Sequence, residues 1–402
     1  MINVAVLGYG TVGSGVVEVL ERNKAQITQR AGRELNVKYI LDLREFPGDP
    51  YEAKVVHDAD VILNDPEVHV VCETMGGLHP AYEFSKRALE SGKSVCTSNK
   101  ELVAAYGPEL IRLAKEKNCS YLFEASVGGG IPIIRPINDC LTAEKIEAVT
   151  GILNGTTNYI LTKMAAEGAE FETVLKEAQD KGYAERNPEA DVEGHDACRK
   201  IAILTSLVTG KHVSYEEIYT EGITKITPAD FAYAKSMGRS IKLLAMSRCT
   251  EDGCYAMVAP FMIPDSHPLY SVNDVFNAVF VQGNMMGDSM YYGRGAGKLP
   301  TASAVVSDVV ESVRNLGGTD DCFWDAEKLS LTNKDAISHR FFVRTKAELK
   351  EKAAELFGAV EEVAAAVQGE YAFVTPAMTE KEFADQAEQL GCVYNRIRME
   401  DK

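Results

Sequence analysis

The chain has 402 residues, of which 46% are hydrophobic and 25% are charged, and its formal net charge at pH 7 is −17. This length exceeds what one ordinary hydrophobic core holds and predicts two or three domains. The negative charge argues against nucleic acid or an anionic membrane as the main partner. The sequence holds no run of about 18 apolar residues, so we predict no transmembrane helix.

The N-terminus and the cysteines indicate the compartment. The chain begins MINVAVLGYG and enters an apolar strand and a glycine turn at once, without the basic segment or cleavage signal of a secretory peptide. The nine cysteines are scattered and form no C-x-x-C pair. We therefore expect free, mostly buried thiols and a cytoplasmic protein.

A glycine-rich turn follows the first predicted strand. Residues 2–7 are apolar and predict this strand, residues 8–13 read GYGTVG, and a helix opens near Gly15. In such a unit the first glycine makes the tight turn, the second lets a pyrophosphate approach the backbone, and the third lets the helix pack closely on the strand. The phosphates then lie at the helix N-terminus, where N–H groups favour anions. We predict a dinucleotide site; the alternative is a tight turn without a ligand. The candidate cofactor-binding residues are Gly8, Gly10, Thr11, Val12 and Gly13.

The end of the second predicted strand, at residues 37–41, bears on the choice of cofactor. Asp42 follows this strand, and an acidic residue there typically binds the ribose 2′-OH of NAD. Arg44 follows two residues later, and an arginine nearby accommodates the 2′-phosphate of NADP. The choice between NAD and NADP stays open, with NAD slightly favoured because Asp42 comes first.

Lys100 is a further candidate for ligand contact. Buried strands are predicted at residues 68–73, 94–97 and 120–123, with a helix at residues 80–91. Lys100 follows the strand at residues 94–97, at the edge where open α/β sheets bind ligands. We expect it to touch cofactor or substrate; the alternative is one of the surface lysines that are common at strand ends.

The stretch after the last of these strands is a candidate cation site. Glu124 opens the stretch EASVGGGIP, in which three consecutive glycines expose backbone carbonyl groups beside a carboxylate. Oxygen ligands of this kind suit a hard cation. The alternative is a flexible crossover between domains.

The second region mixes strands and helices. Strands are predicted at residues 146–153, 255–263 and 275–282, and helices at residues 159–167 and 171–179. Residues 291–297, YYGRGAG, predict a glycine-rich loop. A helix at residues 300–313 follows, and we expect it to return to the first domain.

Within this region, residues 183–200 concentrate charged side chains. Asp191 can cap a helix over residues 192–208, with Gly210 as its stop. Asp196 and Lys200 are four residues apart and share one helix face. Such a carboxylate–lysine pair can handle a proton if it is buried. More often it is a solvated surface pair worth about 0.2–0.5 kcal/mol.

The last region has its own pattern. Strands are predicted near residues 340–345, 371–375 and 393–399, helices at residues 347–356 and 380–390, and a weak strand or short helix at residues 360–367. The order βαββαβ is that of a ferredoxin-like module.

Several motifs together resemble homoserine dehydrogenase. They are GYGTVG, SNK, EASVGGGIPII, GILNGTTNYIL, YAERNPEADVEGHDACRK and GRGAGKLPTASAV, in this order across residues 1–315. The resemblance implies an α/β protein with a Rossmann domain at residues 1–135, completed by the helix at 300–315, and an α+β catalytic and dimerisation domain at residues 136–299. Residues 335–402 would form an ACT-like domain. It also implies a homodimer or homotetramer.

The resemblance implies the reversible NAD(P)-dependent reduction of L-aspartate 4-semialdehyde to L-homoserine, in threonine, methionine and isoleucine biosynthesis. Lys200 matches the acid/base lysine of the family and Asp196 its companion carboxylate. Glu185 and Asp191 match residues that bind homoserine. The chemistry agrees, because a zwitterionic substrate needs a carboxylate for its ammonium group and a protonated lysine can stabilise the alkoxide formed by hydride transfer.

Other matches concern the cofactor and a cation. Lys100 matches a motif lysine near the cofactor, and Gly297 lies in the loop that closes over it. The sodium site of the family matches one acidic residue and three backbone positions, namely Glu124, Val127, Gly129 and Ile131.

The C-terminal region departs from the family pattern. An ACT domain that binds threonine carries Asp-x-Pro-Gly after its first strand, whereas this chain has Arg344-Thr345-Lys346-Ala347. Control by threonine and a purely packing or dimerising module therefore both stay open. The alternative functions are a non-catalytic dinucleotide and amino-acid sensor, and a reductase of another amino-acid semialdehyde. An acylating enzyme would need an activated cysteine, and no cysteine here has a flanking histidine or a helix-start position.

Overall fold

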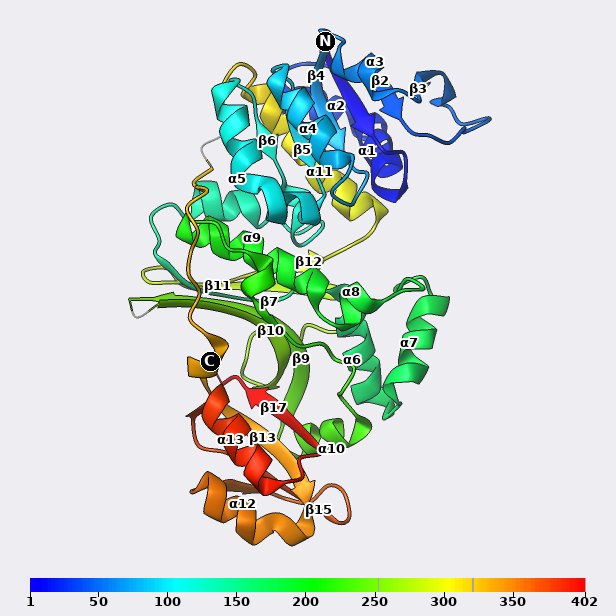
Figure 1. Cartoon of the computed structure of the whole chain (residues 1–402). Helices are drawn as coiled ribbons and strands as arrows, with labels where there is room; N and C mark the ends of the chain where they lie inside the picture. Colours follow the sequence, from blue (N-terminus) through cyan, green and yellow to red (C-terminus); the bar gives the residue numbers. More distant parts are fainter. Residues whose placement is uncertain (252, 320–321, 402) are drawn as a thin grey trace. The chain divides into compact units, whose positions relative to one another are not determined.

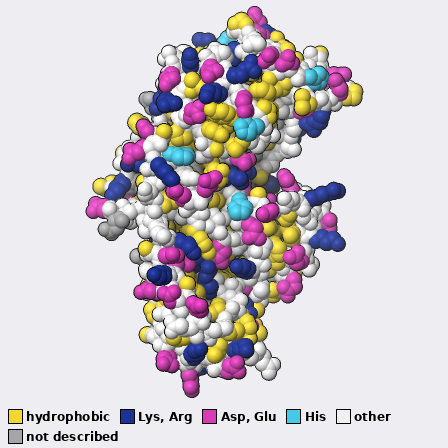
Figure 2. Space-filling model, in the orientation of Figure 1, with side chains coloured by type: hydrophobic (Ala, Val, Ile, Leu, Met, Phe, Trp, Pro, Cys, Tyr) yellow, Lys and Arg dark blue, Asp and Glu magenta, His cyan; other side chains and the backbone are white. Residues whose placement is uncertain are grey.

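The structure is a computed structural model that describes residues 1–251, 253–319 and 322–401 (Figure 1). The chain divides into two compact units. The first comprises Met1–Glu144, Ala202–Tyr215 and Gly293–Leu329; the second comprises Lys145–Ile201, Glu216–Tyr292 and the stretch from Ser330 onward. No helix in the described ranges is long and apolar enough to cross a membrane. On the face shown in Figure 2, acidic and basic side chains are interspersed.

The first unit is a doubly wound α/β domain, as the glycine turn predicts. Its six strands lie in the order β3-β2-β1-β4-β5-β6 and pair in parallel, which is the strand order of dinucleotide-binding folds. The strands are β1 Ile2–Leu7, β2 Leu35–Leu41, β3 Val55–Val56, β4 Val68–Glu73, β5 Ser94–Thr97 and β6 Tyr121–Leu122. The main helices are α1 Thr11–Arg22, α2 Lys24–Ala31, α3 Ala59–Leu63, α4 Ala81–Glu90, α5 Lys100–Glu116 and α11 Lys298–Arg314.

Helix α11, yellow in Figure 1, lies among the blue and cyan elements of this unit although it follows them by almost 200 residues. Its Val305 and Val309 belong to the same hydrophobic core as Val16 of α1. Gly15 permits this packing, because a Cβ atom there would lie 2.9 Å from Cβ of Ala302. Helix α11 thus covers the predicted helix at residues 300–313 and packs within the first unit.

One long helix of this unit is not predicted from the sequence. Helix α5 spans Lys100–Glu116 and holds Pro108 in its interior. Proline ordinarily interrupts a helix, because it lacks an N–H donor and its ring meets the preceding turn. Burial of one face, including Leu102 and Ile111, stabilises the helix in spite of Pro108.

The second unit is built on a mixed sheet of eleven strands. Along its main path the order is β12-β11-β7-β9-β10-β17-β13-β15-β14. The strands of its larger part are β7 Ile146–Ile152, β8 Tyr219–Thr220, β9 Arg239–Thr250, β10 Gly253–Pro264, β11 Phe276–Gly283 and β12 Gly287–Arg294. The helices there are α6 Gly155–Glu167, α7 Phe171–Asp180, α8 Glu189–Val192 and α10 Pro228–Ser236, together with residues 195–201 of α9 His195–Thr209.

Two strands of this sheet differ from expectation. Strand β9 is not predicted, because its stretch KLLAM consists of residues that favour helices. Pairing with β7 on one side and β10 on the other overrides that preference. The predicted loop at residues 291–297 is wrong in its first half, because β12 continues to Arg294.

The C-terminal residues form the predicted βαββαβ order and extend the same sheet. The elements are β13 Ser338–Lys346, α12 Lys350–Phe357, β14 Glu361–Val363, β15 Glu370–Val374, α13 Glu380–Leu390 and β17 Asn395–Met399, with the two-residue strand β16 Met378–Thr379 before α13. The core of this module includes the clustered side chains of Phe341, Phe357, Phe373 and Phe383. Strand β17 pairs in parallel with β10 through Phe261 and Arg398, so the module continues the sheet.

The expectation of nine free thiols is wrong for one pair. Cys249 and Cys254 form a disulfide. They face each other at the end of the β9–β10 hairpin, where cross-strand neighbours lie close together. The other seven cysteines are free thiols, and five of those are buried.

Candidate active site

The charged stretch at residues 183–200 contributes to two helices, and the helix predicted over residues 192–208 starts three residues later than expected, at His195. Asp191 lies inside the short helix α8 and is not an N-cap. Helix α9 begins at His195 and ends at Thr209, before Gly210. Gly194 separates the helices with a φ of +84°, a conformation that glycine adopts without strain. This break places Asp191 and Asp196 on different helices.

Lys200 and Asp196 form a buried pair on α9. The distance between Lys200 Nζ and Asp196 Oδ2 is 2.6 Å, and only 10% and 6% of their side-chain surfaces are exposed. Lys200 Nζ also donates a hydrogen bond to the carbonyl oxygen of Leu153, at 2.7 Å. Burial of both groups excludes the alternative of a solvated surface pair. The Asp196 carboxylate neutralises the ammonium group in this place, and the carbonyl oxygen of Leu153 helps to hold it.

Asn154, which is not among the site residues predicted from the sequence, joins this pair to Asp191. Its Nδ2 donates to Asp196 Oδ2 at 2.8 Å and to Asp191 Oδ1 at 2.7 Å. Its Oδ1 accepts from the main-chain N–H of Thr157 and so caps helix α6. Asparagine between a strand and a helix is a recognisable N-cap signal. The cap was foreseeable from the sequence, but the carboxylates that it binds were not.

Glu185 lies apart from this cluster. It belongs to the exposed loop between α7 and α8, where Gln179 Nε2 donates to its main-chain oxygen at 3.0 Å. Within the described residues, no hydrogen bond or ion pair joins the Glu185 carboxylate to Asp191, Asp196 or Lys200. The structure thus brings together three of the four predicted residues of this stretch.

In the first unit, the glycine turn has the geometry that its predicted function requires. Gly8 has a φ of +91°. A Cβ atom on Gly13 would lie 1.8 Å from the carbonyl oxygen of Gly8, so only glycine fits there. A Cβ atom on Gly10 would meet nothing within 4 Å. Helix α1 starts at Thr11 without a side-chain cap, which leaves its first turn suited to bind an anion.

Asp42 is bound by its neighbour Arg44. Asp42 Oδ1 accepts from the main-chain N–H and from Nε of Arg44, at 3.0 and 2.9 Å. Its Oδ2 accepts from Arg44 Nη2 and from the main-chain N–H of Tyr9, at 2.8 and 2.9 Å. These bonds, above all those from the Arg44 side chain, hold the pKa of the Asp42 carboxyl well below its usual range. Asp42 and Arg44, the two residues predicted to select the cofactor, therefore form an ion pair in which Arg44 covers the carboxylate.

The loops after β4 and β5 are joined by a buried carboxylate, Glu73, which was not singled out in the sequence. Glu73 accepts from Thr97 Oγ1 at 2.6 Å and from the main-chain N–H of Met75 at 2.8 Å. Burial raises the pKa of Glu73. Thr97 in turn accepts from the main-chain N–H of Asn99, which caps α5. Lys100 is the first residue of α5 and is held at the sheet edge by this network.

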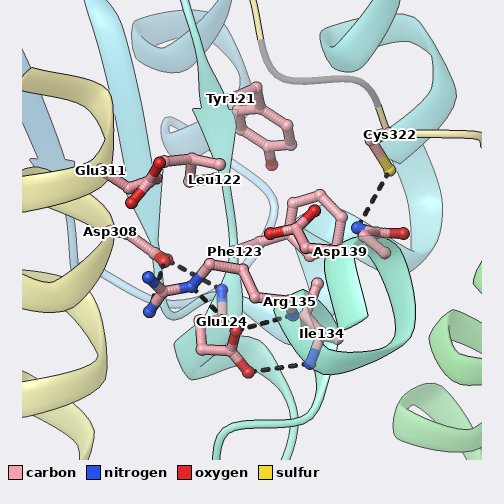
Figure 3. A pocket seen from close by; sticks show the side chains of 11 residues that line it. Tyr121, Leu122, Phe123, Glu124, Ile134, Arg135, Asp139, Asp308, Glu311 and Cys322 are labelled. Carbon is pink, nitrogen blue, oxygen red and sulfur yellow. Dashed lines mark hydrogen bonds and ion pairs between the residues drawn. The ribbon is translucent and has the colours of Figure 1, made fainter. Parts of the chain in front are cut away.

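The candidate cation residue Glu124 uses its carboxylate within the protein (Figure 3). Its two oxygens accept from the main-chain N–H groups of Ile133, Ile134 and Arg135, at 2.6, 2.8 and 2.9 Å. The guanidinium group of Arg135 lies between Glu124 and Asp308, at 3.3 and 3.7 Å. The Glu124 carboxylate thus holds the loop at residues 133–135 in place, and its oxygens are not available to bind a cation.

The glycine stretch after Glu124 lies against the loop that precedes α11. The main-chain N–H of Gly130 donates to the carbonyl oxygen of Arg294 at 3.1 Å. A Cβ atom on Gly129 would lie 2.4 Å from the carbonyl oxygen of Gly295. Gly297 is the N-cap of α11. Among the described residues, no group of three or more His, Cys, Asp or Glu side chains is placed to hold a metal ion.

Comparisons with known proteins agree with this geometry. The family model of homoserine dehydrogenase matches residues 132–310, and that of the homoserine dehydrogenase NAD-binding domain matches residues 8–124. The chain is 43% identical to homoserine dehydrogenase of Bacillus subtilis over 328 residues, which covers 80% of this chain and 76% of that protein. A solved homoserine dehydrogenase from Thiobacillus denitrificans superposes with a TM-score of 0.91 at 37% identity and covers 100% of this chain and 98% of its own. A hyperthermophilic archaeal homoserine dehydrogenase mutant in complex with NADPH superposes at 0.66 with 29% identity, over 77% of this chain and 97% of that one.

Proposed function

The chain belongs to the homoserine dehydrogenase family, NAD(P)-dependent oxidoreductases, and we propose that Lys200 and Asp196 perform the proton transfer of its reaction. The reaction is the reversible reduction of L-aspartate 4-semialdehyde to L-homoserine, on the route to threonine, methionine and isoleucine. One observation carries the assignment: an ammonium group buried 2.6 Å from a carboxylate.

The chemistry follows from this pair. The nicotinamide, when bound, supplies or accepts the hydride. Hydride addition to the aldehyde builds negative charge on its oxygen, and the Lys200 ammonium stabilises that charge and delivers a proton to it. Asp196 keeps the amine in place and favours its charged form. In the direction of oxidation the neutral amine takes the hydroxyl proton of homoserine.

The substrate is a zwitterion and needs anionic partners for its ammonium group. Asp191 is held beside the Lys200–Asp196 pair by Asn154 and is suited to bind this group. Glu185, on its exposed loop, is the second carboxylate that we assign to the substrate. The intact set of these side chains favours an enzyme over a non-catalytic sensor.

For the cofactor, we propose the turn from Gly8 to Gly13 as the pyrophosphate site, with Lys100 and the loop at Gly297 completing it. The Asp42–Arg44 ion pair favours NADP. This differs from the slight preference for NAD that was expected because Asp42 precedes Arg44 in the sequence. A ribose 2′-OH can reach Asp42 only if the guanidinium group moves away, whereas a 2′-phosphate can bind that group directly. The archaeal relative was solved with NADPH.

Replacement of Arg44 tests this preference. Arg44→Ala removes the 2′-phosphate partner and uncovers Asp42, so we expect KM for NADP to rise roughly 10- to 100-fold, as for a lost charged hydrogen bond. KM for NAD should fall. Arg22→Ala, at an exposed arginine of the same unit, is the control and should change neither value. Equal changes for both cofactors would remove Arg44 from the 2′ position.

A sodium ion, if bound, would be held by main-chain oxygens rather than by a side chain. The carboxylate of Glu124 is committed to three main-chain N–H groups. We therefore assign the coordination to the carbonyl groups of Val127, Gly129 and Ile131, and assign to Glu124 the shaping of the loop. The cation would stabilise the loop and takes no part in the proton transfer.

For the C-terminal module, we propose a packing role in a homodimer or homotetramer rather than control by threonine. Arg344, at the end of the first strand, is committed to Asp230 at 2.7 Å and to Glu370 at 2.8 Å. Its guanidinium group also donates to Thr227 Oγ1. The place of the effector turn is therefore occupied by bonds that fasten the module to α10. The ACT-like order persists without the ligand-binding turn.

The test of the whole proposal is homoserine-dependent reduction of NAD and NADP at alkaline pH, with and without threonine. Turnover with at least one cofactor is expected, and threonine should leave the rate unchanged. Binding of the cofactor without any turnover would instead favour a sensor or another semialdehyde substrate. Inhibition by threonine would contradict the packing role of the C-terminal module.

A further inference from the structure

The strongest unassigned feature is the way in which Asn154 joins two helices through two carboxylates. Its amide nitrogen donates to Asp191 of α8 and to Asp196 of α9, at 2.7 and 2.8 Å. Asp196 Oδ2 thus receives a hydrogen bond from Asn154 and one from Lys200 on the same oxygen atom. One side chain, only 5% exposed, connects the proposed substrate carboxylate with the proposed proton-transfer pair.

The contacts of the Asn154 amide oxygen determine which way the amide group is oriented. Asn154 Oδ1 accepts from the main-chain N–H of Thr157 at 2.9 Å and from its hydroxyl group at 3.1 Å. A main-chain N–H can only donate, so the atom that faces it must be the amide oxygen. The NH₂ group must therefore face the carboxylates. Only an amide satisfies both sides, because serine, threonine and aspartate caps lack the two donated hydrogens.

The start of α6 is also held by contacts with the segment that precedes β11. Asn158 Nδ2 donates to the carbonyl oxygens of Val272 and Phe276, at 3.3 and 3.0 Å. A Cβ atom on Gly155 would lie 2.8 Å from the carbonyl oxygen of Val275. The cap residue therefore has little freedom to move, and the position of its NH₂ group is preorganised.

The charges explain why such a donor is needed. Two carboxylates, those of the half-buried Asp191 and the buried Asp196, accept from the one Asn154 amide group and repel each other as like charges, while Lys200 pairs with Asp196. Two N–H donors on the shared side offset this repulsion. They also hold Asp191 and Asp196 at one distance, although Gly194 separates their helices.

We propose that Asn154 is a positioning residue that sets the substrate-binding carboxylate and the proton-transfer pair in register. This role rests on the proposed function of Lys200, Asp196 and Asp191. Asn154 acts through these carboxylates and undergoes no covalent change. Its loss therefore affects both the binding of homoserine and the rate of the chemical step.

The main test is Asn154→Ser, which keeps an N-cap acceptor and removes both donated hydrogen bonds. We expect kcat/KM for homoserine to fall roughly 10- to 100-fold, since small misplacements of reacting groups have effects of this size. KM for homoserine should rise and kcat should fall, while KM for the cofactor stays unchanged. The acidic limb of the pH–rate profile should move to higher pH, because the carboxylates of Asp191 and Asp196 lose the N–H donors that stabilise their charged forms.

Asn154→Asp sharpens the test, because it is isosteric and also caps the helix. It replaces the NH₂ group with a third carboxylate oxygen, so the loss at alkaline pH should exceed that of Asn154→Ser. The ratio of its rate to the wild-type rate should increase as the pH falls, because a protonated carboxyl group can again donate one hydrogen bond. A purely structural role would not produce this pH dependence.

Gly168→Ala is the matched control for the stability of α6. Gly168 caps the other end of this helix with a φ of +65°, so alanine there strains the helix without touching the carboxylates. Its melting temperature should fall while kcat/KM and the pH profile are kept. If Asn154→Ser behaves like Gly168→Ala, the positioning role is wrong. If the wild type does not oxidise homoserine, or Lys200→Ala is fully active, the proposed function fails instead.

Discussion

Two lysines of the second unit are almost completely buried, and they differ in their partners. Lys200 on α9 lies 2.6 Å from a carboxylate. Lys242 on β9 is 1% exposed, and its acceptors among the described residues are uncharged oxygens, those of Val272 at 2.5 Å, Asn273 at 2.8 Å and Asn158 at 3.5 Å. Burial lowers the pKa of Lys242 to about 8. Burial alone therefore does not identify the lysine that handles a proton.

The difference shows what the carboxylate adds. Asp196 holds the charge of Lys200 in a place where Asn154 and Asp191 supply further polar contacts for a substrate. Lys242 instead joins β9 to the segment before β11, and its amine is enclosed by main-chain and amide oxygens. The surroundings of Lys200 suit proton transfer to a substrate, whereas those of Lys242 suit a structural role.

Lys200→Ala should produce the largest effect. Removal of the acid/base group should lower kcat by about 10³-fold, within the range for general acid–base catalysis. Dissociation constants for NAD and NADP, measured by fluorescence titration, should not change. Lys242→Met is the matched control, since it removes the other buried amine and should keep kcat within a few-fold. A comparable loss of kcat in both variants would mean that burial, and not the carboxylate partner, defines the catalytic lysine.

Asp196→Asn should have the next largest effect, because it gives Lys200 the uncharged partners that Lys242 has. The amide keeps the size and one acceptor oxygen but no charge. We expect kcat to fall about 10²-fold. The pH–rate profile for homoserine oxidation should move to lower pH, since the ammonium form loses its stabilising charge. A profile that stays in place would show that Asp196 only orients the amine.

The sequence predicted the elements whose apolar runs end at glycine or polar turns. The strands β1, β4 and β5 match their predicted bounds, and the parallel order follows from the glycine turn before α1. Strand β9 and helix α5 were missed because tertiary contacts override their local preferences: pairing on both sides for β9, and burial around Pro108 for α5. Local propensity contains no information on such partners.

The same division applies to the site. The pair Asp196 and Lys200 is visible from spacing, because four residues are one helical turn. Asn154 was missed because its partners lie 37 and 42 residues away in the chain. The covering of Asp42 by Arg44 joins residues only two positions apart, yet both were interpreted as separate ligands of the cofactor. Contacts between distant segments, and competition between near neighbours, require the fold.

Lys242→Met should have the smallest effect on activity and a distinctive effect on stability. The pKa of Lys242 is lowered from 10.5 to about 8, so the folded protein binds this proton more weakly than the unfolded chain. Below about pH 8 the charged amine favours unfolding, and this effect fades as the pH rises toward about 10.5. Relative to the wild type, Lys242→Met should gain up to roughly 3 kcal/mol in free energy of unfolding at low pH, and the gain should disappear near the upper limit. Loss of the hydrogen bonds to Val272 and Asn273 shifts the difference in free energy of unfolding between the two proteins by about 1 kcal/mol at every pH. The change of this difference with pH, and not its size at one pH, therefore tests the prediction. Urea unfolding of both proteins at several pH values measures this difference in free energy of unfolding. A difference that does not depend on pH would mean that uncharged oxygens stabilise the charge of Lys242 as well as a carboxylate does. The contrast between Lys242 and Lys200 would then be wrong.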